Sequence, residues 1–226
     1  MKSLCIVPAR SGSKQIKNKN IKKLGRNYLF YYSLKFAKKL KFIDKIVFSS
    51  DSKKYLKLAS RLNDIELSLR PNSISRDNTM MIDVIKYEFE KLKKKGEIYD
   101  LILLLQPTCP FRKIKDFVSA YKELKSKRYD SAISITKVKE HPDRMKVFKK
   151  GKLQNYNHKL ITENFMPRQV LTPVYLRSGS MYFFYSSLLP KNKIIGEKVF
   201  SIKVENKYAI NIDTIEDFIV AKYYFK

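Results

Sequence analysis

Short apolar runs alternate with segments of helical periodicity along most of this 226-residue chain, and this alternation constrains the fold more than any other feature. The β-prone runs occupy 3–8, 45–50, 101–105 and 131–136, and helical patterns lie between them at 28–39, 52–62, 79–94 and 115–127. The run at 101–105 is apolar throughout, which is typical of a central strand covered on both faces. The pattern predicts an α/β fold with a doubly wound, mostly parallel sheet of the Rossmann-like type. Ligands bind such sheets beyond the carboxyl ends of the strands, so the polar loops after residues 8, 50 and 106 should share one cleft.

The alternation stops after about residue 138. The stretch 138–178 contains Pro142, Pro167 and Pro173 and only short apolar pieces, which indicates an inserted arm without a core of its own. The α/β pattern resumes at 180–185 and 198–204, and a last helix over 214–224 starts at a capping signal that includes Asp213, Thr214 and Asp217. We therefore expect one domain over 1–226 with an arm at 138–178.

The formal net charge of +27 raises the question of a nucleic-acid partner. The basic residues are spread over the whole chain and form no single tail or stripe, which favours a generally basic surface that attracts polyanionic small molecules. No apolar run approaches the roughly 20 residues of a membrane span, so we expect a cytoplasmic protein without a membrane partner. In that compartment Cys5 and Cys109 should be reduced thiols.

The segment 8–20 is the first candidate for a binding loop. It follows a predicted strand and carries Arg10, Lys14 and Lys19 among small polar residues, so amides, hydroxyls and cations are available to hold phosphates. It has neither the spacing of a P-loop nor that of a dinucleotide-binding fingerprint. Taken alone, the segment is also compatible with a solvated turn.

Several motifs in order resemble those of the acylneuraminate cytidylyltransferases, also called CMP-sialic acid synthetases. They are Pro-Ala-Arg-Ser-Gly-Ser-Lys at 8–14 with Lys-Asn at 19–20, Phe-Ser-Ser-Asp at 48–51, Leu-Arg-Pro at 69–71 with Asp77 and Thr79, Leu-Leu-Gln-Pro-Thr-Cys-Pro-Phe-Arg at 104–112, Glu-His-Pro at 140–142, Pro-Arg-Gln at 167–169 and Asn-Ile-Asp-Thr at 211–214. The resemblance covers nearly the whole chain. It implies a Rossmann-like nucleotidyltransferase that pairs as a homodimer through the arm.

The resemblance also implies roles for individual residues. Lys19, Arg10 and Asp213 would be catalytic, with Lys19 nearest the reacting α-phosphate. The nucleotide would contact Arg10, Ser13, Lys14, Lys19, Asn20, Arg70 and Gln106. The sugar would contact Gln106, Arg168, Gln169, Ser178 and Tyr182, and the guanidinium of Arg168 would match the sugar carboxylate.

A magnesium ion is the expected cofactor, because Mg²⁺ prefers carboxylate, water and phosphate oxygens. The family's usual Asp-Ile-Asp reads Asn211-Ile212-Asp213 here, so one carboxylate is replaced by an amide. Asp213 would hold the metal together with the bound phosphates, and Asn211 would offer a carbonyl oxygen. The alternative reading of Asp213 is a helix cap alone.

The sequence thus predicts transfer of CMP from CTP to an acidic nonulosonic sugar, with release of pyrophosphate. Ser178 stands where the family commonly has Asn, which leaves the identity of the sugar open. The alternatives are a related transferase that uses another nucleotide or a sugar phosphate, a basic nucleic-acid-binding protein, and an inactive relative whose metal site is impaired by Asn211.

Overall fold

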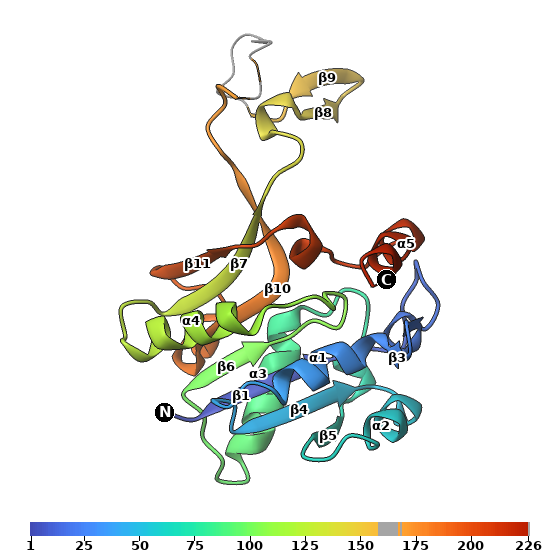
Figure 1. Ribbon diagram of the computed structural model, residues 1–226, viewed down its shortest axis with the longest axis vertical. Helices are drawn as coiled ribbons and strands as arrows, with labels where there is room; N and C mark the ends of the chain where they lie inside the picture. The colour runs from blue at the N-terminus through green and yellow to red at the C-terminus, as the bar shows by residue number, and fades with distance from the viewer. Residues whose placement is uncertain (158–166, 168, 226) are drawn as a thin grey trace.

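A seven-stranded mixed sheet forms the centre of the computed structural model, which describes residues 1–157, 167 and 169–225 (Figure 1). The strand order is β11-β7-β10-β6-β1-β4-β5. These strands are β1 (Ser3–Pro8), β4 (Lys45–Ser50), β5 (Glu66–Leu69), β6 (Leu101–Leu104), β7 (Ser131–Lys137), β10 (Tyr175–Tyr185) and β11 (Val199–Lys203). β10 runs antiparallel to both its neighbours, and the other pairings in this sheet are parallel.

Helices cover both faces of the sheet, which confirms the doubly wound architecture (Figure 1). The α-helices are α1 (Leu29–Ala37), α2 (Lys53–Ala59), α3 (Met81–Lys93), α4 (Ile114–Lys125) and α5 (Ile215–Tyr223). Short 3₁₀ helices are η1 (Lys19–Ile21), η2 (Asn72–Ile74), η3 (Pro142–Arg144), η4 (Ser186–Lys191) and η5 (Asn206–Ala209). Two small hairpins are formed by β2 (Lys23–Leu24) with β3 (Asn27–Tyr28) and by β8 (Lys146–Lys149) with β9 (Lys152–Asn155).

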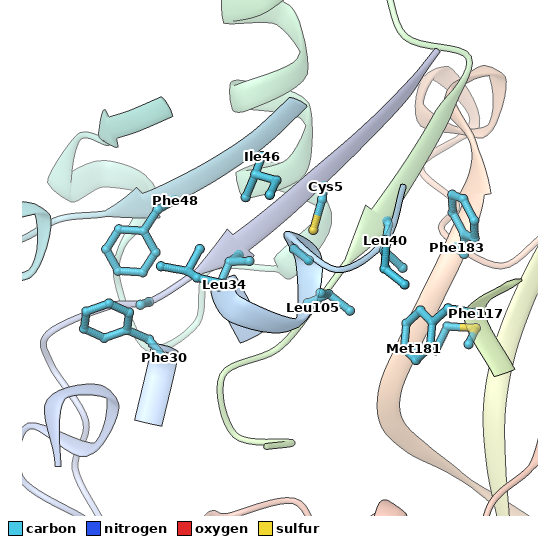
Figure 2. Close-up of a cluster of buried hydrophobic side chains, with 14 of the residues drawn as sticks. Cys5, Phe30, Leu34, Leu40, Ile46, Phe48, Leu105, Phe117, Met181 and Phe183 are labelled. Carbon is cyan, nitrogen blue, oxygen red and sulfur yellow. The ribbon is translucent and has the colours of Figure 1, made fainter. Parts of the chain in front are cut away.

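The central strands are buried on both faces because they separate two hydrophobic clusters. Cys5 of β1 lies in the cluster that contains Phe30 of α1 and Phe117 of α4 (Figure 2). Leu4 lies in the other cluster, with Ile85 of α3. Successive side chains of a strand point to opposite faces, so both sets must be apolar, which accounts for the apolar runs in the sequence.

The described part of the predicted arm projects from one end of the sheet. β7 and β10 continue beyond their neighbours as a two-stranded ribbon that leads to the β8–β9 hairpin (Figure 1). β10 begins at Tyr175, inside the range expected for the arm, and its pairing with β7 shifts register between Arg177 and Tyr182. Neither the antiparallel direction of β10 nor the edge strand β5 was predicted.

Among the residues that the structure describes, no helix combines the length and hydrophobicity that crossing a bilayer requires.

Candidate active site

A cavity of about 340 Å³ lies beyond the carboxyl ends of β1 and β6. It is lined by Pro8, Arg10, Ser13, Lys19, Asn20, Arg70, Met81, Gln106, Pro107, Thr108, Asn211 and Asp213. Of the three loops expected to share one cleft, those after residues 8 and 106 line this cavity, and the loop after residue 50 does not. The cavity gathers almost all of the residues predicted for the nucleotide and the metal, although they come from sequence positions as far apart as 10 and 213.

The loop after β1 is fixed by hydrogen bonds to its neighbours. Both carboxylate oxygens of Asp51, which follows β4, accept from Ser11: the backbone N–H at 2.8 Å and the hydroxyl at 2.9 Å. The side-chain amide of Asn20 donates to the Arg10 carbonyl at 2.9 Å. Asp51 thus anchors the loop that carries Arg10 and Ser13.

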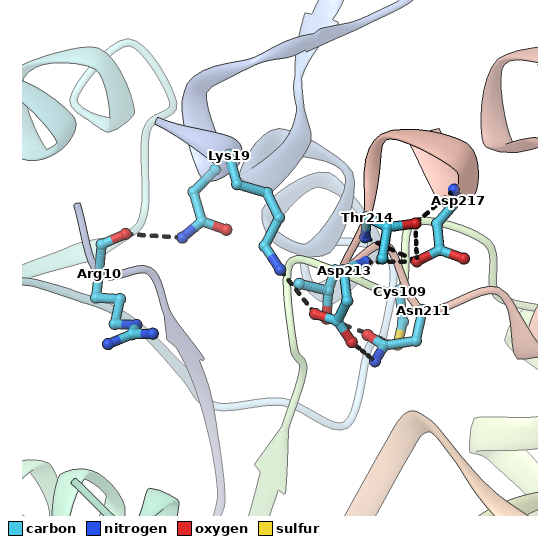
Figure 3. Close-up of polar contacts among 9 residues, drawn as sticks. Arg10, Lys19, Cys109, Asn211, Asp213, Thr214 and Asp217 are labelled. Carbon is cyan, nitrogen blue, oxygen red and sulfur yellow. Dashed lines mark hydrogen bonds and ion pairs between the residues drawn. The ribbon is translucent and has the colours of Figure 1, made fainter. Parts of the chain in front are cut away.

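Lys19 and Asp213 meet because a small hydrophobic cluster joins their segments. Ile212 is fully buried with Ile16, Leu24 and Phe218, so the residues on either side of Ile212 are placed next to the 16–24 segment. Lys19 Nζ lies 2.7 Å from Asp213 Oδ1, and the Lys19 side chain is only 12% exposed. The ammonium is therefore held at the wall of the cavity with one carboxylate beside it (Figure 3).

The second oxygen of Asp213 accepts from the amide of Asn211 at 2.5 Å. The Cys109 thiol donates to the Asn211 carbonyl oxygen at 3.6 Å, so the amide nitrogen faces the carboxylate (Figure 3). Cys109 is fully buried, and this burial raises the pKa of its thiol to about 11.

The helix cap at this corner is Thr214. Its hydroxyl accepts from the Asp217 backbone, and the Asp217 carboxylate accepts from the Thr214 N–H in a capping box. Asp213 is not needed for that role, and its half-exposed carboxylate faces the cavity.

Two polar atoms of cavity residues stand out among the described side chains because they are buried without a hydrogen-bond partner. They are Arg70 Nη1, a donor, and Asn20 Oδ1, an acceptor. Arg70 is 5% exposed, and burial lowers the pKa of its guanidinium. Unpaired buried polar groups are costly, and a bound polar ligand would satisfy them.

Arg112 is a supporting residue that the sequence reasoning did not single out, although it ends the Leu-Leu-Gln-Pro motif. It donates to the Gln106 carbonyl at 2.8 Å, the Ser180 carbonyl at 2.9 Å and the Ser33 hydroxyl at 3.1 Å. Burial lowers the pKa of Arg112 to about 10, so it stays charged at neutral pH. It ties α1, β10 and the end of β6 together beneath Gln106.

Most of the described residues predicted to contact the sugar do not line this cavity. Gln106 lines the cavity, whereas Ser178 is buried and its hydroxyl donates to Ser134 Oγ at 2.6 Å. Tyr182 is partly buried on β10 opposite Leu104. Gln169 is exposed in the arm and does not line the cavity, and Arg168 lies outside the described residues.

A second cavity of about 580 Å³ adjoins the first, and Asn211 lines both. Its walls include Lys137 and Leu176 at the base of the arm, Val220 of α5, and Tyr224 directly after α5. In the part of the chain that the structure describes, no three His, Cys, Asp or Glu side chains gather as a metal centre.

Comparisons with known proteins fit this geometry. The family model described as cytidylyltransferase matches residues 4–218. The chain is 26% identical to N-acylneuraminate cytidylyltransferase of Streptococcus agalactiae serotype V over 97% of its own length, and it spans about half (52%) of that relative. It is 28% identical to pseudaminic acid cytidylyltransferase of Campylobacter jejuni serotype O:2, over 100% of the chain and 97% of the relative.

The fold is also found in solved structures. CMP:2-keto-3-deoxy-manno-octonic acid synthetase complexed with CTP superimposes with a TM-score of 0.72 over 100% of this chain and 98% of that one, at 12% identity. A 4-diphosphocytidyl-2C-methyl-D-erythritol synthase superimposes with a TM-score of 0.69 at 11% identity. At these identities the likeness establishes the shared α/β fold.

Proposed function

The chain belongs to the cytidylyltransferase family, and from this premise we propose that it transfers CMP from CTP to a nonulosonic 2-keto sugar acid and releases pyrophosphate. The observation that carries the proposal is the single cavity that gathers Arg10, Ser13, Lys19, Asn20, Arg70 and Gln106 around Asp213. The names of the sialic-acid and pseudaminic-acid relatives support the acidic nine-carbon class of acceptor.

The charges of the cavity suit a nucleoside triphosphate. Arg10 and Lys19 supply cations, and the Ser13 hydroxyl lies on the same loop. The unpaired Arg70 donor and Asn20 acceptor match a nucleotide, which carries both acceptors and donors. The adjoining cavity at Asn211 offers space for an acceptor next to the Lys19–Asp213 pair.

A magnesium ion fits the donor set if phosphate oxygens supply most of its ligands. Asp213 offers a half-exposed carboxylate, and Mg²⁺ in phosphoryl-transfer sites is commonly bound by one or two carboxylates plus substrate phosphates. Asn211 would contribute a carbonyl oxygen only after its amide group turns over, because its nitrogen now faces Asp213. The ion would neutralise phosphate charge, and Asn211 would orient Asp213 for it.

The reaction exchanges one oxygen bond of the α-phosphorus for another and releases one proton. The anomeric hydroxyl oxygen of the sugar bonds to the α-phosphorus, the bond between that phosphorus and the bridging oxygen of pyrophosphate breaks, and the hydroxyl proton passes to solvent. Lys19 and Arg10 stabilise the charge that develops on the phosphate oxygens, and the cavity aligns the two reactants.

The test is a pyrophosphate-release assay with CTP, Mg²⁺ and a panel of nonulosonic and shorter 3-deoxy 2-keto acids. We expect release with at least one nonulosonic acid and none without sugar. Replacing CTP by UTP, GTP or ATP should lower the rate strongly. A folded protein that releases no pyrophosphate above the no-sugar control with any acid would refute the proposal, and a preference for another nucleotide would favour the related-transferase alternative.

We further propose that the arm joins two copies of the chain as a homodimer. The β8–β9 hairpin exposes Phe148 (74%) and Leu153 (65%), and Tyr156 beside it is 59% exposed. Contiguous apolar side chains on a projecting element are typical of an interaction surface.

A further inference from the structure

Arg10 and Lys14, two cations predicted for the phosphates, are already paired with an acidic side chain of the same chain. Arg10 Nη1 donates to Asp77 Oδ1, and Lys14 Nζ lies 2.6 Å from Asp77 Oδ2. The carboxylate therefore uses both oxygens to bridge two cations of the loop after β1, as a phosphate group with two free oxygens would.

Asp77 itself does not line the cavity, but residues on both sides of it in the sequence do. It lies in the 71–80 segment, which follows the cavity residue Arg70 and precedes the cavity residue Met81. The turn around Asp77 is closed by the Thr79 backbone, which donates to the Arg76 carbonyl at 3.2 Å, and by the Arg76 backbone, which donates to the Thr79 hydroxyl at 3.0 Å. The Asp77 contacts thus join the 71–80 segment to the loop after β1 beside the cavity.

The segment is anchored at its ends and exposed in its middle. The Arg70 N–H donates to the Ser50 carbonyl at 2.9 Å. At the other end, Ile82 and Ile85 of α3 are buried in the core. Between these anchors residues 76–78 are exposed, and the Asp77 side chain is 43% exposed. The contact can therefore break without loss of buried apolar surface.

On the basis of the proposed nucleotide site, we propose that Asp77 is an internal anion that competes with the phosphates of the nucleotide for Arg10 and Lys14. Nucleotide binding displaces Asp77 and frees the 71–80 segment from the loop after β1. When pyrophosphate leaves, Asp77 returns to the two cations and opposes rebinding of pyrophosphate.

The strength of the contacts fits reversible displacement. Exposed ion pairs contribute little to stability and are screened by salt, so a multiply charged phosphate chain can outcompete a single carboxylate. Removing the Asp77 charge should therefore raise the affinity for polyphosphates, whereas a carboxylate that merely positions Arg10 and Lys14 would lower it when removed.

The test compares Asp77→Asn with the wild type by calorimetric titration of inorganic pyrophosphate, CTP and cytidine. We expect Asp77→Asn to bind pyrophosphate and CTP roughly 3- to 10-fold more tightly, since two exposed ion pairs no longer compete. Affinity for cytidine, which has no phosphate, should be unchanged. Asp83→Asn is the matched control, because Asp83 is exposed in the first turn of α3 and its loss changes the net charge equally.

A second comparison uses a Lys14→Met background. One of the two cations released by Asp77→Asn is then missing, so the gain in pyrophosphate affinity should shrink. Equal or weaker pyrophosphate binding by Asp77→Asn, or the same gain with Asp83→Asn, would overturn the proposal. Tighter pyrophosphate binding without any CTP-dependent transfer would leave it standing and instead count against the proposed function.

Discussion

At the scale of single residues, a chain of contacts leads from the buried Cys109 thiol through Asn211 and Asp213 to Lys19. The thiol orients the amide of Asn211, the amide orients the carboxylate of Asp213, and the carboxylate holds the Lys19 ammonium in place before any ligand binds. Preorganised charge of this kind is effective in phosphoryl transfer because little reorganisation is needed at the moment of reaction.

Lys19→Met should lower the turnover rate by roughly 10²- to 10³-fold, because the cation proposed to lie nearest the reacting phosphate is lost. The melting temperature should change little, since the ion partner Asp213 is half exposed and is not left buried. Lys17→Met, at an exposed position two residues earlier, is the matched control. Steady-state kinetics and thermal unfolding measure the two effects, and a rate within a few-fold of the wild type would contradict the assignment.

Asn211→Asp should increase the affinity for a divalent cation by about tenfold, because a second carboxylate joins Asp213. The same change removes the amide that donates to Asp213 and places two like charges together, so it should lower the melting temperature when no metal is present. Titration of Mn²⁺ followed by electron paramagnetic resonance reads the affinity directly. Unchanged Mn²⁺ binding would show that residue 211 does not face the metal.

The sequence identified most of these residues by type and order. What it could not give was their pairing, and the alternative reading of Asp213 as a helix cap stays open until Thr214 is seen to fill that role. Arg112 was missed for a similar reason. A buried arginine whose partners are carbonyls and a hydroxyl leaves no signature in spacing.

At the scale of elements, a glycine in β10 packs against side chains that support the site. Gly179 has φ +79°, and a Cβ there would lie 3.1 Å from Gln106 Oε1 and 3.2 Å from Cys109 Sγ. The register shift between Arg177 and Tyr182 occurs around this residue. The glycine thus allows β10 to pass close to both the cavity residue Gln106 and the thiol that orients Asn211.

Gly179→Ala should destabilise the protein by about 1–3 kcal/mol, from the positive φ and from the two close contacts. It should also raise the KM for the sugar acid, since Gln106 has to move. Gly96→Ala is the control, because Gly96 has φ +82° with open space around it and reports the backbone effect alone. Equal destabilisation by the two substitutions in chemical denaturation would argue against the contacts.

Elements that bury an apolar face were predictable, and those that do not were missed. β1 and β6 are apolar because both of their faces are covered. β5 is short and ends at the exposed Leu69, while β8 and β9 are mostly exposed and rich in Lys. The direction of β10 depends on its pairing with β6 and β7, which local sequence does not encode.

At the scale of the whole molecule, the projecting arm exposes an apolar surface, and we expect this surface to join two copies of the chain. The β8–β9 hairpin, which carries the exposed Phe148 and Leu153, lies apart from the seven-stranded sheet (Figure 1). Association through the hairpin would cover this surface, and burial of apolar area is the main driving force for such contacts.

A double substitution, Phe148→Ser with Leu153→Ser, should convert the proposed homodimer into a monomer in multi-angle light scattering, because it removes the two most exposed apolar side chains of the hairpin. Ile98→Ser is the control, since Ile98 is 63% exposed and lies in the loop between α3 and β6. A wild-type protein that is monomeric at micromolar concentration, or a dimer that survives the double substitution, would contradict the role of the arm.

The product itself gives the most direct test of the central claim. ³¹P nuclear magnetic resonance of a reaction with CTP, Mg²⁺ and the preferred nonulosonic acid should show one new phosphodiester resonance from CMP joined to the anomeric carbon, together with an equal amount of pyrophosphate. Formation of CDP and inorganic phosphate, or of free CMP without the phosphodiester, would contradict cytidylyl transfer.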